Sequence, residues 1–162
     1  ISDKIDTLKT YLKDNNIGIC CIQETHLTKD KPLKVRGYQV FRSDREGRKK
    51  GGVVTLVRNN IIAKEDQRFM KEAEFIQVTI SAKNRQLQLV NFDCPDDKAL
   101  SLDKIQVPDS NFLIAGDFNS KSPWWGYKGT DPIGRSVQKL ANHHNVVFLN
   151  EKGVATLGTI KC

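Results

Sequence analysis

The stretch Asn-Phe-Leu-Ile-Ala-Gly-Asp-Phe-Asn-Ser, residues 111–120, places a short apolar run directly before a carboxylate and an amide. The apolar part, Phe112 to Ala115, has the length of a buried strand and is far shorter than a membrane span. Gly116 begins a polar loop that carries Asp117 and Asn119. We therefore expect a buried strand that holds a carboxylate rigidly at the rim of a sheet.

Two other apolar segments end in the same way. Ile17–Ile22 leads into Gln-Glu-Thr-His, which contains Glu24, and Leu87–Phe92 leads into Asp93. Carboxylate oxygens suit Mg²⁺, which proteins bind through one or two carboxylates together with substrate phosphates. The same residue types are also ordinary caps of helices and turns. The spacing alone leaves both interpretations open.

The remaining periodicity predicts short strands and a few helices. Helices are expected from an N-cap at Ser2 to about Asn15, over Lys98–Gln106, and from Pro132 through His144. Further strands are expected over Tyr38–Arg42, Val53–Arg58, Ile76–Ser81 and Val146–Leu149, with a turn at Lys83-Asn84 before Leu87–Phe92. This order favours a layered α/β or α+β sandwich, and the lack of a long linker favours one domain.

Composition narrows the possible classes of protein. The 162 residues carry a net charge of +7 and are 38% hydrophobic. The charge fits a polyanionic partner such as nucleic acid, although basic chains without one are common. A mean hydropathy of −0.48 argues against a membrane protein. Without a secretory signal or a C-x-x-C pair, the four cysteines predict an intracellular protein with reduced thiols and no zinc ribbon.

Three motifs in this order resemble the endonuclease/exonuclease/phosphatase family. They are Cys-Ile-Gln-Glu-Thr-His-Leu (21–27), Gly-Gly-Val-Val-Thr-Leu-Val (51–57) and Leu-Ile-Ala-Gly-Asp-Phe-Asn-Ser-Lys-Ser-Pro-Trp-Trp-Gly (113–126). The Trp-Trp-Gly ending resembles endonuclease domains of non-LTR retrotransposons, especially the jockey-like LINE clade. So do Gly-Arg-x-x-x-x-Leu (134–140) and Val-Val-Phe-Leu-Asn (146–150).

The resemblance implies a DNase I-like, four-layer α/β sandwich, here as a single partial domain over residues 1–162. It implies hydrolysis of a DNA phosphodiester with Mg²⁺ or Mn²⁺, in which one strand is nicked to prime reverse transcription. By the same resemblance Glu24 binds the metal, Asp117 positions or activates the attacking water, and Asn119 holds the scissile phosphate. The implied partners are DNA and the element's RNA or reverse transcriptase domain in a parent polyprotein. A monomer without membrane attachment, acting in the nucleus, is expected.

The sequence departs from the family pattern at three places. The 162 residues contain neither the expected N-terminal strand with its asparagine nor a Ser-Asp-His segment, so we interpret the chain as truncated at both ends. Asp93 stands where the family usually has a tyrosine. Because loss of a general base costs about 10²–10⁴-fold, we expect this chain alone to be inactive. The alternatives are a catalytically dead nucleic-acid-binding remnant and a phosphoesterase of the same fold with another substrate.

Nucleic-acid contacts are predicted at a basic segment and at an aromatic pair. The basic side chains are Arg42, Arg45, Arg48, Lys49 and Lys50, which would either contact phosphates or form a solvated hairpin. Trp124 could stack on a base, while one tryptophan of the Trp124-Trp125 pair could equally anchor the loop in the core. His26 is either a neighbour of the metal or phosphate, or a structural side chain at the base of its loop.

Overall fold

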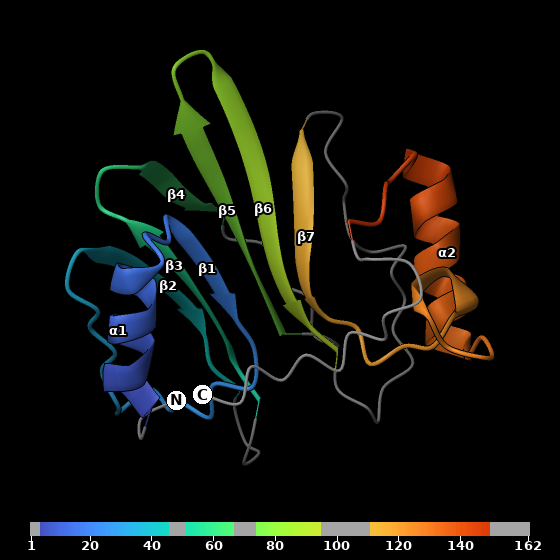
Figure 1. The fold of residues 1–162 in the computed structure, drawn as a ribbon, viewed down its shortest axis with the longest axis horizontal. Helices are drawn as coiled ribbons and strands as arrows, with labels where there is room; N and C mark the ends of the chain where they lie inside the picture. Colours follow the sequence, from blue (N-terminus) through green and yellow to red (C-terminus); the bar gives the residue numbers. More distant parts are fainter. Residues whose placement is uncertain (1–3, 46–50, 67–73, 95–110, 150–162) are drawn as a thin grey trace. The chain divides into compact units, whose positions relative to one another are not determined.

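A computed structural model describes residues 4–45, 51–66, 74–94 and 111–149. The chain divides into two compact units (Figure 1). The first unit comprises Ile1–Asp93 and Pro108–Asp117, with Cys162, and the second comprises Cys94–Val107 and Phe118–Lys161.

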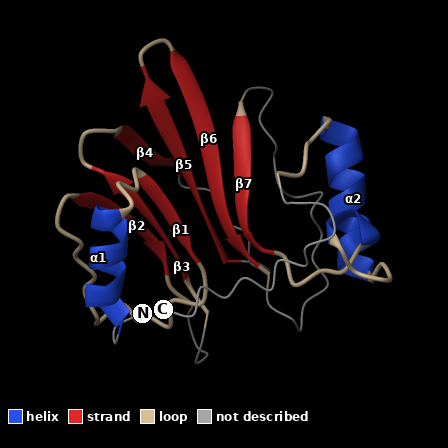
Figure 2. Cartoon of the chain, viewed as in Figure 1, coloured by secondary structure: helices blue, strands red, loops and turns tan. Residues whose placement is uncertain are grey.

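Two sheets make up most of the first unit (Figure 2). One has the order β1-β3-β2 and is antiparallel throughout, with β1 at Ile19–Ile22, β2 at Tyr38–Ser43 and β3 at Val53–Arg58. The other has the order β4-β5-β6-β7, with β4 at Ile62–Asp66, β5 at Glu74–Ala82, β6 at Arg85–Asp93 and β7 at Phe112–Asp117. Only β6 and β7 pair in parallel within this second sheet.

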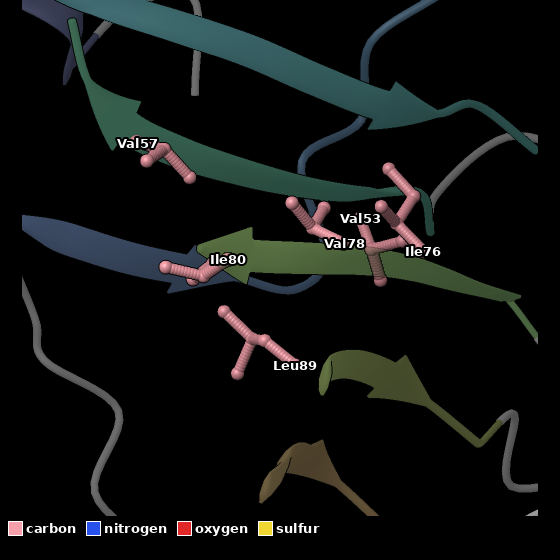
Figure 3. Close-up of a cluster of buried hydrophobic side chains, with 6 residues drawn as sticks. All are labelled: Val53, Val57, Ile76, Val78, Ile80 and Leu89. Atoms are coloured by element: carbon pink, nitrogen blue, oxygen red, sulfur yellow. The ribbon is translucent and has the colours of Figure 1, made fainter. Parts of the chain in front are cut away.

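Strand β3 forms the centre of the core because both of its faces are apolar. Val53 and Val57 pack between the sheets against β5 and β6 side chains such as Val78 (Figure 3). Alternate residues of a strand point to opposite faces, so Val54 and Leu56 pack on the outer side of the same sheet, in the cluster that contains α1 (Ile5–Asp14). The first unit is thus layered as helix, sheet and sheet.

The second unit contains the short 3₁₀ helix η3 (Pro123–Trp125) and helix α2 (Pro132–His144). Asp131 caps α2 by accepting a hydrogen bond from the Gly134 amide. A Cβ atom at Gly134 would lie 2.0 Å from the Lys121 carbonyl oxygen, so the helix approaches this backbone only because the residue is glycine. This contact gives a structural reason for the glycine of the Gly-Arg-x-x-x-x-Leu pattern.

Comparison with the sequence expectations confirms the α/β class and most elements. The expected strand over Val53–Arg58 coincides with β3, and the expected turn at Lys83-Asn84 joins β5 to β6. The strand expected at Val146–Leu149 is wrong. Its residues form neither helix nor strand, and the side chains of Val147 and Leu149 are exposed.

Two further expectations for strands need correction. β4 was not predicted, because only Ile62 and Ala63 among its five residues are apolar. β7 is less buried than its apolar run suggested, and Leu113 is 36% exposed.

The expected N-cap at Ser2 and helix at Lys98–Gln106 lie outside the described residues. Among the helices that the structure describes, none combines the length and apolar character that crossing a bilayer requires.

Candidate active site

Acidic side chains of the first unit gather where β1, β6 and β7 end. Because β6 and β7 run parallel with Asp93 beside Asp117, these two side chains share one face of the sheet. Leu89, four residues before Asp93, packs between the sheets, so this is the inward face. Glu24 follows β1 by two residues and acts on Asp93 as a nearby negative charge, as does Asp117. The structure thus brings Glu24 and Asp117 together around Asp93.

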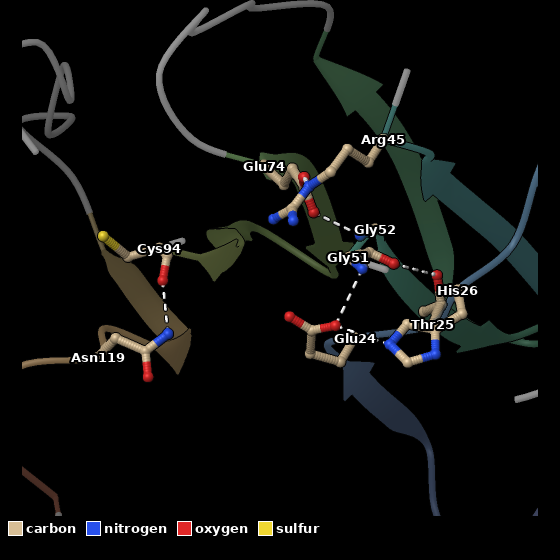
Figure 4. A network of polar contacts seen from close by, with 9 residues as sticks. All are labelled: Glu24, Thr25, His26, Arg45, Gly51, Gly52, Glu74, Cys94 and Asn119. Carbon is tan, nitrogen blue, oxygen red and sulfur yellow. Dashed lines mark hydrogen bonds and ion pairs between the residues drawn. The ribbon is translucent and has the colours of Figure 1, made fainter. Parts of the chain in front are cut away.

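The loop that carries Glu24 is fixed to the beginning of β3. The Gly51 amide donates to Glu24 Oε2 at 2.9 Å, and His26 Nε2 lies 2.8 Å from the same oxygen (Figure 4). The backbone amides of Thr25 and His26 donate to the carbonyls of Gly52 and Gly51. Glu24 and His26 have φ angles of 50° and 53°, in the sparsely populated left-handed region. These contacts orient the Glu24 carboxylate, and the His26 ring is one of the two groups that contact its Oε2 atom.

The glycine pair is required by this arrangement. Gly51 and Gly52 have φ angles of 96° and 88°, which side-chain-bearing residues rarely adopt. A Cβ atom at Gly52 would also lie 2.7 Å from Thr25 Oγ1. The Gly52 amide donates to the Glu74 carboxylate, which also accepts from Arg45 (Figure 4). Arg45 is therefore paired with a carboxylate at the edge of the site.

Asn91 lies fully buried beneath the acidic residues and joins the two sheets. Its Nδ2 donates to the Val54 carbonyl at 2.9 Å, and its Oδ1 accepts from Gln23 Nε2 at 2.6 Å. A buried amide needs such partners, because an unsatisfied polar group in the core costs about 1–3 kcal/mol. Asn91 thereby fixes the residue before Glu24 relative to β6.

Asp93 is the most deeply buried carboxylate of the cluster, at 1% exposure. Burial, followed by the neighbouring negative charges of Glu24 and Asp117, raises the pKa of Asp93 to about 6, against the opposing effects of Arg45 and the Glu24 backbone amide. Its Oδ2 has no hydrogen-bond partner among the described residues. Asp93 was expected at a strand end, among carboxylates of a kind that suits a metal ion, but it received no specific role from the family resemblance. The sequence signal for its burial is the spacing along the strand. Asp93 lies two residues after Asn91 and four after Leu89, so the three side chains share one face.

Asn119 and Trp124 belong to the second unit. Asn119 Nδ2 donates to the Cys94 carbonyl at 2.6 Å, and its φ angle is 44°. Trp125 is buried and its indole donates to the Ser120 carbonyl, which confirms the expected anchoring of this loop by one tryptophan. Trp124 is 43% exposed and its ring meets that of Phe148 edge-on. Base stacking by Trp124 stays a prediction.

The predicted basic segment is described only in part. Arg42 donates to Asp44 and to the carbonyls of Thr28 and Lys31. Both Arg42 and Arg45 therefore make internal contacts in this structure, and their contact with phosphate stays a prediction. The other three expected cations, Arg48, Lys49 and Lys50, lie outside the described residues.

The donor set can be tested against a divalent cation. Within the described ranges, no three histidine, cysteine, aspartate or glutamate side chains are placed to enclose a metal ion. An open site needs only one or two carboxylates, with water and phosphate completing the shell. The buried oxygen of Asp93 without a hydrogen bond, beside two further carboxylates, is the kind of uncompensated negative charge that a cation would balance. The residues therefore fit an open, hard-cation site.

The chain is similar to a described protein family and to proteins of mobile elements. The family model described as Endonuclease/Exonuclease/phosphatase family matches residues 2–159. The chain is similar to the "RNA-directed DNA polymerase from mobile element jockey" of Drosophila melanogaster, with 20% identity over 155 residues, and to that of Drosophila funebris, with 20% identity over 153 residues. These alignments cover 85% and 83% of this chain but only 16% and 15% of the relatives' lengths.

A solved structure shares the fold. The structure titled "Endonuclease domain of TRAS1, a telomere-specific non-LTR retrotransposon" superposes with a TM-score of 0.72 at 21% sequence identity. The superposition covers 91% of this chain and 67% of that one. This likeness confirms the expected DNase I-like α/β architecture of two sheets with helices. The family match over nearly all residues, together with the strand-end carboxylates, shows that the chain belongs to the endonuclease/exonuclease/phosphatase family.

Proposed function

We propose that this chain is the catalytic domain of a retrotransposon-type DNA endonuclease that depends on Mg²⁺ or Mn²⁺. The observation that carries the proposal is the meeting of Glu24 and Asp117 around Asp93 at the ends of β1, β6 and β7. Support comes from the family match over residues 2–159 and from the relatives, which are polymerases of mobile elements. We propose that both units belong to one partial domain, because the family match spans them.

The family resemblance gives each candidate residue a proposed role. Glu24 binds the cation, since its carboxylate is oriented by the Gly51 amide and His26 while half of the side chain stays exposed. Asp117 positions the attacking water, and Asn119 holds a phosphate oxygen through its amide. A bound divalent cation would polarise the phosphoryl oxygen and stabilise the leaving oxygen.

The proposed biological role is to nick one strand of target DNA, so that the new 3′-hydroxyl primes reverse transcription of the element's RNA. The net charge of +7 favours binding to a polyanion. We propose DNA as the substrate, with the element's RNA or a reverse transcriptase domain of a parent polyprotein as partner. The protein would act as a monomer in the nucleus, where the target DNA lies.

The test is conversion of supercoiled plasmid to the nicked form. The chain is joined to the N-terminal asparagine strand and the Ser-Asp-His segment of a relative, and is compared in Mg²⁺ and in EDTA. We expect Mg²⁺-dependent nicking that falls by about 10²–10⁴-fold in Glu24→Gln and Asp117→Asn. Asp6→Asn, which changes an exposed carboxylate on α1, should nick like the parent.

The 162-residue chain alone should nick far less, because the family's Ser-Asp-His segment is not among its residues. Nicking that survives both substitutions, or that persists in EDTA, would contradict the proposal. A folded, extended protein that binds DNA without nicking it would instead favour the nucleic-acid-binding remnant. Cleavage of a small phosphoester with none of plasmid DNA would favour another phosphoesterase of this fold.

A further inference from the structure

The strongest feature without an assigned role is the carboxylate of Asp93. Its side chain is 1% exposed, and Oδ2 has no hydrogen-bond partner among the described residues. The Glu24 backbone amide donates to the same carboxylate, so Oδ1 is the oxygen that it engages. A buried, ionised oxygen without a donor is costly, and proteins retain such groups where a ligand satisfies them.

Neighbouring cations of the protein do not remove this deficit. Arg45 is near enough to act on Asp93 electrostatically, but its Nε pairs with Glu74, and its buried Nη2 makes no hydrogen bond to Asp93 or to any other described residue. Glu24 and Asp117 are two further carboxylates near enough to act on Asp93. Among the described residues, the groups around Asp93 therefore carry more negative than positive charge, beside a carboxylate that solvent scarcely reaches.

We infer that Asp93 is a direct ligand of the divalent cation, offering Oδ2 beside the carboxylate of Glu24, so that this chain holds the ion with two carboxylates. The inference rests on the proposed function and adds a ligand to it. An aspartate here supplies a hard anionic oxygen, which a tyrosine at this position, expected from the family resemblance, would not supply at neutral pH. Two carboxylates with water and phosphate suit Mg²⁺ and Mn²⁺.

Strand geometry explains how Asp93 can reach the ion. Asp93 and Asp117 are register partners on parallel strands, and the Glu24 amide bonded to Asp93 fixes the loop after β1 against β6. The Asn91 contact with Gln23 fixes the same loop one residue earlier. One contact of the Glu24 backbone and one of the Gln23 side chain therefore hold the loop after β1 against β6, and Asp93 is in place before the ion binds.

The test is a calorimetric titration of the 162-residue chain with Mn²⁺ alone at pH 7.5. We expect one ion to bind the parent chain. Asp93→Asn keeps the shape of the side chain and the oxygen that accepts from the Glu24 amide. Loss of a residue that only supports a metal ligand already weakens metal binding by about 10–100-fold, so loss of a direct ligand should weaken Mn²⁺ binding by at least about tenfold. Asp93→Tyr should weaken it similarly. Asp6→Asn should leave it unchanged, because Asp6 is exposed on α1.

A second measurement excludes misfolding as the cause. Mn²⁺ should raise the thermal midpoint of the parent chain and of Asp6→Asn, but raise that of Asp93→Asn far less, at matched secondary structure by circular dichroism. Equal Mn²⁺ affinity of the parent chain and Asp93→Asn, with binding lost in Glu24→Gln, would overturn the inference and leave the proposed function intact. Absence of Mn²⁺ binding by the folded parent chain would overturn the inference too, and plasmid nicking then decides the proposed function separately.

Discussion

Replacing Asp93 by asparagine should stabilise the metal-free protein, although it damages the proposed metal site. Asparagine has nearly the same shape, keeps an oxygen to accept the Glu24 amide and carries no charge. The parent protein must hold a buried carboxylate beside Glu24 and Asp117, and this disfavours the ionised form in the folded state. The substitution removes that penalty.

The size and sign of the effect follow from the pKa of Asp93. Its rise from the ordinary 3.8 to about 6 corresponds to roughly 3 kcal/mol at 1.36 kcal/mol per pH unit. Water reaches the half-exposed Glu24 side chain beside it, so we expect about 1–3 kcal/mol after screening. Because the pKa of Asp93 is raised in the folded state, the folded protein keeps this carboxyl protonated up to a higher pH than the unfolded chain does. The penalty is therefore absent below about pH 4, grows to about pH 6 and is complete above that.

Urea denaturation in EDTA at pH 5 and pH 7.5 measures this difference. Asp93→Asn should exceed the parent chain in free energy of unfolding at pH 7.5, and by less at pH 5. Asp6→Asn should stay within about 0.5 kcal/mol of the parent, because that carboxylate is exposed. A variant less stable than the parent at pH 7.5, or an equal difference at both pH values, would refute the account of Asp93 as a strained, buried charge.

Three further predictions concern the residues that support the site. Asn91→Ala should cost about 2–4 kcal/mol in urea denaturation, because this fully buried amide loses its hydrogen bonds to Gln23, Val54 and Thr55. A cost below about 1 kcal/mol would contradict this. Gly52→Ala should lower the thermal midpoint more than Gly37→Ala. Both glycines have positive φ, but of these two only Gly52 lacks room for a Cβ atom. Equal shifts of the thermal midpoint would exclude the steric cause. Trp125→Ala should lower the free energy of unfolding by about 3–5 kcal/mol, and Trp124→Ala should lower it clearly less, because Trp125 is buried and Trp124 is 43% exposed. The reverse order in urea denaturation would show that Trp124 is the anchor.

Local pattern was enough to predict the elements with strong apolar periodicity. Val53–Arg58 is apolar on both faces and matches β3 to the residue. β4 escaped prediction because it is held by backbone pairing with β5 along its length and has few apolar side chains. Val146–Leu149 has the composition of a strand, but among the described residues it pairs with no neighbouring strand, and composition alone does not supply one.

The site could be predicted only as separate pieces. Glu24, Asp93 and Asp117 were each expected at the end of an apolar run, and the family resemblance singled out Glu24 and Asp117 among them. Their meeting around Asp93 depends on the parallel register of β6 and β7, which pairs residues far apart in the sequence. The burial of Asp93 depends on the same pairing. Local periodicity carries no information about such long-range register, so the burial of Asp93 and its position between the other two carboxylates were identified only in the structure.

The location of a bound cation tests the central claim most directly. Crystals of the chain soaked in Mn²⁺ would give an anomalous difference peak at the ion. The account predicts a peak within bonding distance, about 2.0–2.3 Å, of Asp93 Oδ2 and of a Glu24 carboxylate oxygen, where the ends of β1 and β6 meet. A well-ordered cluster without a peak at saturating Mn²⁺, or a peak bound elsewhere and not by these two side chains, would contradict it.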